Sequence, residues 1–179
     1  VQVTAEVTPK HLILTDEALR TFETRYKVNP PIRSEEHRAA CVAGLQDGTI
    51  DAVVTDHAPH EWEEKDQEFN LAPSGFVGLE TSVGAMLTYM YHTGHIDLMT
   101  LVNAMSTAQA KILGLDAGVI APGKDADLTV LDLDKEWTVD SSKFYSKGKA
   151  SPFDEMIFKG KAAATIVNGE IVMKNGEVL

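Results

Sequence analysis

The feature that most limits how this chain can fold is a short, nearly all-apolar segment, Ile50–Thr55, that runs directly into the polar segment Asp56–His60. An apolar run of this length is typical of a parallel strand that is buried on both faces. Asp56–His60 carries one acidic residue and two histidines, and burial of unpaired charge is costly. The pattern therefore predicts a polar site where a buried parallel strand ends.

Two further segments belong to the same prediction. Val1–Val7 alternates apolar and polar residues, which predicts a second strand. Val28–Arg33 is a second polar cluster, in which Asn29-Pro30-Pro31 predicts a rigid, non-helical loop. The chain opens directly on a predicted strand and has no initial Met, so we expect it to be the C-terminal piece of a longer protein.

The remaining elements follow from periodicity and from helix-terminating and turn residues. The sequence predicts a short helix after Thr15, a helix from Ser34 to about Gly48, a long loop over 61–78, a helix over 79–92, and helices after Asp97 and after Thr107 that end at Gly114. Downstream, Asp127–Asp132 alternates like a strand, Asn168-Gly169 is a strong hairpin signal, and Asn175-Gly176 predicts another turn.

This order predicts an α/β chain in two parts. Residues 1–116 alternate strands and helices, and residues 117–179 form a small antiparallel β unit.

Composition excludes some classes of function. The 179 residues are 44% hydrophobic and carry a net charge of −11, which argues against nucleic acid as a partner. No apolar run approaches the ~20 residues that a membrane span needs. The single cysteine, Cys41, fits a reducing, cytoplasmic environment.

Asp56 is the strongest candidate for chemistry. In a β/α barrel the carboxyl ends of the strands form the catalytic edge. A carboxylate at that edge can bind a divalent metal and accept a proton, although a strand-end Asp can also simply cap the next loop. Because Pro59 prevents a helix, we expect His57 to pack or hydrogen-bond beside the site instead of ligating metal.

His60 is better placed to reach a substrate, and a histidine in a loop can donate to a carboxylate. Asn29 offers both a donor and an acceptor, which suits an amide or imide edge, although it also fits a simple turn before proline. Pro73–Phe76 could offer backbone groups to a ligand. A hydrolytic zinc centre needs about three protein ligands, so Asp56 alone predicts that the others lie elsewhere in a longer protein.

Several motifs together resemble the bacterial type I dihydroorotases of the amidohydrolase superfamily. They are Thr4–Pro9, Lys27–Arg33, Asp51–His60, Gly78–Thr81, Ala110–Leu115, Pro122–Val130, Ser151–Phe153 and the terminal hairpin. The resemblance covers essentially the whole chain. It implies the C-terminal part of a metal-dependent (β/α)8 TIM barrel, here its last two strands, plus part of a small β-sandwich.

By the same resemblance, Asp56 is the metal-binding Asp that carries the proton. His60 and Asn29 bind substrate, and Pro73 and Gly75 lie where backbone contacts to the ring are made. The family's other metal ligands would precede Val1. Lys10 departs from the family, which often has His there, and we expect no effect on the chemistry.

The implied reaction is the reversible closure of N-carbamoyl-L-aspartate to L-dihydroorotate in pyrimidine biosynthesis. We expect zinc, as two ions in the complete protein, a homodimer, and aspartate transcarbamoylase as a candidate partner. The alternatives are another cyclic amidohydrolase, a hydantoinase or allantoinase, and a non-catalytic dihydroorotase-like subunit that scaffolds aspartate transcarbamoylase.

Overall fold

The computed structural model describes all 179 residues. Its first two strands, β1 (Glu6–Val7) and β2 (Ala52–Val53), pair in parallel, with Val7 beside Val53. The predicted parallel strand is therefore confirmed. Both strands are shorter than predicted, because each has a single neighbour and only the residues that face it complete the ladder.

The segment between these strands contains α1 (Pro9–Ile13) and α2 (Glu35–Asp47). As predicted, α2 follows Ser34 and ends at Gly48, whose φ of 82° is the left-handed conformation that closes helices. The short helix expected after Thr15 is a 3₁₀ helix over Asp16–Thr21, and another 3₁₀ turn covers Thr24–Tyr26.

The segment after β2 is mostly loop, as predicted for 61–78, but it also contains the short helix α3 (Trp62–Lys65). Three helices follow, α4 (Ser82–Met86), α5 (Leu98–Val102) and α6 (Ala108–Leu113). α4 continues through a π-helical segment over Leu87–Tyr91, and α5 runs into α6 through another over Asn103–Thr107. The helix expected at Leu79 therefore begins three residues later.

The last part of the chain is an antiparallel sheet with strand order β3-β4-β5-β6. The strands are β3 (Leu128–Thr138), β4 (Ile157–Val167), β5 (Glu170–Lys174) and β6 (Glu177–Val178). Asn168 and Gly169 both have positive φ, 51° and 83°, as a tight two-residue hairpin requires. Both predicted Asn-Gly turns are confirmed.

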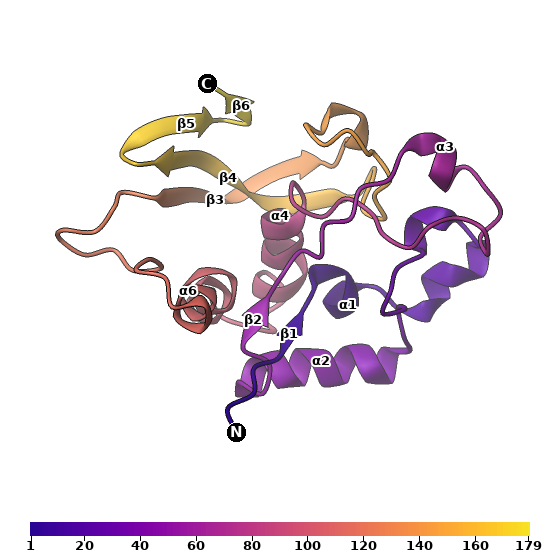
Figure 1. Cartoon of the computed structure of the whole chain (residues 1–179), viewed down its shortest axis with the longest axis horizontal. Helices are drawn as coiled ribbons and strands as arrows, with labels where there is room; N and C mark the ends of the chain where they lie inside the picture. The colour runs from indigo at the N-terminus through magenta and orange to yellow at the C-terminus, as the bar shows by residue number, and fades with distance from the viewer.

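The sheet lies on one side of the molecule and α1, α2 and α6 on the other, with α4 between them (Figure 1). One core lies among the helices and β1 and β2, and it includes Val7, Leu12, Val53 and Met86. A second core joins α4 to the sheet, where Phe158 packs edge-on against Trp137, with ring centroids 5.5 Å apart.

The second core takes residues from both predicted parts, Val77 and Ala85 from the first and Val139 and Phe158 from the second. The division at residue 116 stays a prediction. None of the helices combines the length and the apolarity needed to cross a membrane.

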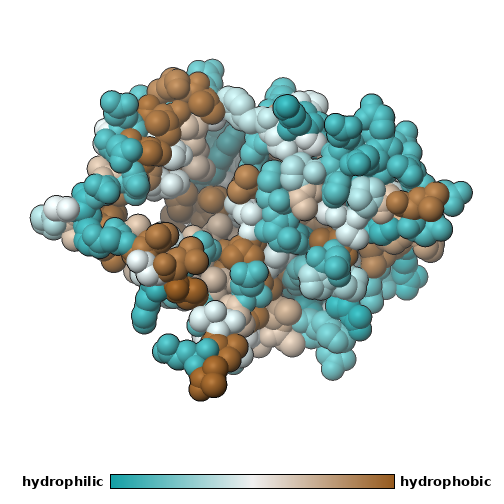
Figure 2. All heavy atoms as spheres, in the orientation of Figure 1, coloured by the Kyte–Doolittle hydropathy of each residue, from teal (hydrophilic) through white to brown (hydrophobic).

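Large apolar side chains are exposed on and after α6. Leu113 is 69% exposed and Ile120 is 89% exposed. Hydrophobic atoms gather over this segment and at the N-terminus in the space-filling view (Figure 2). Such surface is unusual for a chain that folds without a covering partner.

Candidate active site

The segments that follow β1 and β2 leave the same edge of the sheet, because the two strands are parallel. The chain after β1 enters α1 at once, and α1 carries Lys10 and His11. The loop after β2 carries Asp56, whose φ of 48° is in the left-handed region and whose side chain is 45% exposed. Asp56 therefore stands at the predicted strand end with its carboxylate partly open to solvent.

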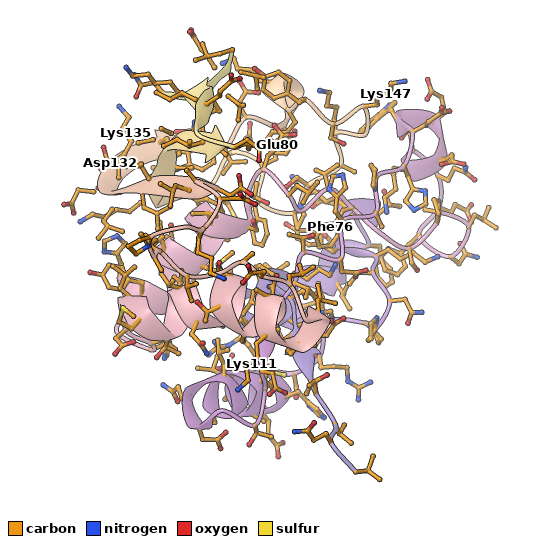
Figure 3. All side chains as sticks on the ribbon, turned by 60° about the vertical axis from the view of Figure 1, so that its left-hand side comes forward. Phe76, Glu80, Lys111, Asp132, Lys135 and Lys147 are labelled. Atoms are coloured by element: carbon orange, nitrogen blue, oxygen red, sulfur yellow. The ribbon has the colours of Figure 1, made fainter.

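A buried lysine pairs with this carboxylate. Lys10 is 1% exposed, and its Nζ atom lies 2.7 Å from Asp56 Oδ2 and 3.3 Å from the Asp56 carbonyl oxygen. The same ammonium lies 4.8 Å from the ring centroid of Phe76, which Figure 3 shows in the middle of the molecule. Burial lowers the pKa of Lys10, and the hydrogen bond and charge of Asp56 oppose that effect.

His11 connects α1 to the segment that carries Asn29. Its Nδ1 atom lies 2.7 Å from Thr8 Oγ1, and its Nε2 atom lies 3.0 Å from the Pro30 carbonyl oxygen. Burial lowers the pKa of His11, although the Pro30 carbonyl opposes this. Asn29 is exposed next to this anchored Pro30 and forms no side-chain hydrogen bond.

The two histidines after Asp56 have different surroundings. His57 Nδ1 accepts hydrogen bonds from the backbone N–H groups of Gly78, at 3.0 Å, and Leu79, at 3.4 Å. This confirms the expectation that His57 hydrogen-bonds beside the site. His60 Nε2 lies 3.0 Å from the Ser74 carbonyl oxygen, and its Nδ1 lies 3.3 Å from Glu64 Oε2. His60 therefore contacts the loop that carries Pro73 and Gly75.

A second buried lysine organises that loop. Lys65 is 2% exposed and donates from Nζ to the carbonyl oxygens of Pro73 and Gly75, each at 2.9 Å. Burial, with a smaller contribution from the charge of Lys27, lowers the pKa of Lys65 to about 8. The ammonium has no carboxylate partner, so the loop carbonyls are what stabilise its charge.

This arrangement limits the predicted ring contacts. The Gly75 N–H donates to the Lys27 carbonyl oxygen at 2.9 Å, and the carbonyls of Pro73 and Gly75 accept from Lys65. Proline has no N–H. A ligand can therefore use only the second lone pair of each carbonyl, because the other backbone groups are already bonded within the protein.

The structure brings the loops of Asp56, His60, Pro73 and Gly75 together through direct contacts. It links Asn29 to them through Pro30 and His11, and through the bond from Gly75 to Lys27. Sequence reasoning missed Lys10 and Lys65. The one available signal for Lys10 was its position directly after a strand and a proline, at the same sheet edge as Asp56.

No cluster of three or more His, Cys, Asp or Glu side chains that could hold a metal ion occurs in the chain. Asp56 can supply one ligand atom to a metal ion, because Oδ2 is bonded to Lys10 and Oδ1 accepts no hydrogen bond. A carboxylate can ligate a metal through one oxygen while the other is hydrogen-bonded. Of the ligands that a metal centre needs, this chain can thus supply one, the carboxylate of Asp56.

The sequence matches the amidohydrolase family over residues 4–172. A dihydroorotase from Citrifermentans bemidjiense is 51% identical over 96% of this chain and 40% of its own length. A dihydroorotase from Acetivibrio thermocellus is 44% identical over 100% of this chain and 42% of its own length. The chain thus spans less than half the length of these relatives.

Solved structures are similar as well. The L-hydantoinase (dihydropyrimidinase) from Arthrobacter aurescens superimposes with a TM-score of 0.94 and is 38% identical. The match covers 99% of this chain and 40% of that protein. The fold described above is therefore that of a part of such an enzyme.

Proposed function

Because this chain belongs to the amidohydrolase family, we propose that it is part of a dihydroorotase. The reaction is the reversible closure of N-carbamoyl-L-aspartate to L-dihydroorotate in pyrimidine biosynthesis. The observation that carries the proposal is the identity of 44 to 51% to proteins named dihydroorotase, over nearly the whole chain. Identity to the hydantoinase is lower, 38%.

Within that protein we propose that the chain is the C-terminal part. Its first part, residues 1–116, supplies the last two strands of a (β/α)8 barrel, and residues 117–179 supply part of a β-sandwich. Two features support this, the parallel pair β1 and β2 and the separate antiparallel sheet β3-β4-β5-β6. Barrel closure needs strands from the rest of the protein.

Asp56 is the proposed proton carrier. In the hydrolytic direction its carboxylate takes a proton from the water that attacks the ring carbonyl. The same group then gives that proton to the ring nitrogen as the carbon–nitrogen bond breaks. Oδ1 is the oxygen left for both roles, as the metal ligand and as the acceptor of the water proton through its second lone pair, because Oδ2 is held by Lys10.

Amidohydrolases are generally metal-dependent, and we propose zinc as the metal. When bound, zinc would polarise the ring carbonyl and favour attack by water. Asp56 would be one of its ligands, and the other ligands would come from the rest of the protein, where a binuclear centre would be completed. This chain alone offers no further ligand cluster.

We place the substrate between Asp56 and the loop held by Lys65. His60 would hold the substrate carboxylate by exchanging its contact with Glu64 or with the Ser74 carbonyl oxygen for one with the substrate. Asn29, exposed and free of side-chain bonds, would contact the imide edge of the ring. Pro73 and Gly75 would contribute through their carbonyl oxygens alone. This differs from a site in which the backbone N–H group of Gly75 meets the ring, because that group donates to the Lys27 carbonyl oxygen.

The complete protein tests this proposal. We expect it to open the ring of L-dihydroorotate faster than that of hydantoin, measured as product formed under the same conditions. A faster reaction with hydantoin would assign the chain to the hydantoinases, which the Arthrobacter aurescens structure makes the second candidate. No turnover of either ring would favour the non-catalytic subunit. We also propose a cytoplasmic homodimer, with aspartate transcarbamoylase as a candidate partner.

A further inference from the structure

Lys10 approaches Asp56 from the protein interior. Its side chain is 1% exposed, whereas the side chain of Asp56 is 45% exposed. The ammonium therefore meets the carboxylate from the buried side, and the rest of the carboxylate is open to solvent. This placement differs from a surface ion pair, in which both partners are solvated and worth little.

The ammonium is held in place by more than one contact. Its Nζ atom donates to Asp56 Oδ2 and to the Asp56 carbonyl oxygen, at 2.7 Å and 3.3 Å. The Phe76 ring lies 4.8 Å away and provides a cation–π contact. Because a buried ammonium without a partner is very costly, Lys10 cannot leave Asp56 without a large free-energy cost.

The two contacts fix both the backbone and the side chain of Asp56. The residue has a positive φ of 48°, a conformation that is uncommon outside glycine and that Asp adopts more often than most other residues. One cation that binds its carbonyl and its carboxylate together selects that backbone conformation and one carboxylate orientation. It leaves Oδ1 as the oxygen without a protein partner.

We propose that Lys10 is a positioning residue, which holds Oδ2 of Asp56 and so presents Oδ1 to the metal and to the attacking water. The inference rests on the proposed function of Asp56 and goes beyond it, because it assigns a role to a residue outside the predicted site. The expectation from the sequence is that lysine at this position has no effect on the chemistry. The contact between Lys10 and Asp56 leads us to propose the opposite, which the variants below test.

The test is a double-mutant cycle in the complete protein with Lys10→Met, Asp56→Asn and both together. Misplacement of a reacting group by about 1 Å can cost about 10²-fold in rate. We expect Lys10→Met to lower kcat by about that factor, with KM within about twofold and metal content unchanged. In the Asp56→Asn background, Lys10→Met should have no further effect on kcat, because Lys10 acts through Asp56.

Equal losses of kcat from Lys10→Met in both backgrounds would overturn the inference, as would an unchanged kcat in Lys10→Met alone. If Lys10→Met does not fold, Lys10→Gln replaces it, since Gln keeps a hydrogen-bond donor without the charge. The same comparison in the two Asp56 backgrounds then decides.

The outcome is separable from that of the proposed function. If the wild-type protein turns over no cyclic amide, the proposed function fails, and the melting temperatures of the same four proteins test the inference. Different losses of Tm from Lys10→Met in the two backgrounds would show that Lys10 and Asp56 are energetically coupled. Equal losses would overturn the inference.

Discussion

Gly75 and Ala58 lie so close together that a Cβ atom on Gly75 would come within 2.8 Å of both the Ala58 Cβ atom and the Ala58 carbonyl oxygen. The same added atom would lie 3.1 Å from His60 Nε2. Gly75 also has a φ of 129°, which side chains strongly disfavour. The contact therefore holds the loop of Pro73 and Gly75 directly against the segment that carries Asp56 and His60.

Gly75→Ala should destabilise the protein and displace His60. A matched control is Gly94→Ala, which also has positive φ, 76°, but has open space around the added atom. We expect Gly94→Ala to cost about 1 to 2 kcal/mol from its backbone conformation alone. Gly75→Ala should lower the free energy of unfolding, measured in urea, by clearly more than Gly94→Ala does. It should also lower kcat/KM. Equal costs for the two variants would show that the close contact with Ala58 is not tight.

The sequence predicted those turns and helix ends that depend on the backbone preferences of one or two residues. Asn168-Gly169 gave the hairpin because few other dipeptides accept positive φ at both positions. The end of α2 at Gly48 followed from the same preference for positive φ, whereas Ser34 at its start makes no capping hydrogen bond with its side chain. The strand lengths did not follow, because they depend on how many neighbouring strands complete the ladder. The π-helical segments left no signal in the apolar spacing.

The candidate site was predictable only in part. Asp56 and His60 stand out because polar residues follow a buried strand. Lys10 also follows a strand and a proline, but this position alone does not identify its partner, which lies 46 residues away. Lys65 lies among the charged residues of 61–68, a composition that predicts a solvent-exposed loop, yet Lys65 is only 2% exposed. Only tertiary structure identifies such residues.

His60→Ala and Asn29→Ala should lower kcat/KM for dihydroorotate in the complete protein by about 10- to 100-fold, the usual effect of losing a hydrogen bond to a charged or buried polar group. Metal content should not change, because neither residue is a proposed ligand. His37→Ala is the control, since His37 lies on α2 and contacts Ser34. Loss of metal in either site variant would mean that ligands and substrate contacts had been confused.

Lys65 should make stability rise with pH above about 8. Its pKa is about 8 in the folded protein and 10.5 when unperturbed. Between these values the folded chain has released the proton and the unfolded chain still binds it, so the free energy of unfolding increases with pH. Below about 8 both states are protonated and the dependence disappears. Melting temperatures of wild type and Lys65→Met, compared from pH 7 to pH 10, measure it.

In Lys65→Met this rise should be absent. The Tm of the wild type minus the Tm of the variant should therefore increase as the pH rises. A difference that stays constant from pH 7 to pH 10 would mean that the pKa of Lys65 is not lowered by its burial.

The isolated 179-residue chain should be inactive and should associate. Two strands cannot close a barrel, and β1 and β2 leave open edges that pair readily with other chains. Exposed apolar side chains after α6 add to this tendency. Size-exclusion chromatography and an assay with added zinc measure both properties. A monodisperse, active fragment would require a complete metal site within this chain.

The most direct test of the whole account is the effect of Asp56→Ala on dihydroorotate turnover in the complete protein, with metal content measured on the same samples. The variant removes both the proposed proton carrier and one proposed metal ligand, and proton transfer alone is typically worth about 10² to 10⁴ in rate. We predict that kcat falls at least that far and that bound metal decreases. Activity within about tenfold of wild type would contradict the assignment of Asp56 and, with it, the proposed site.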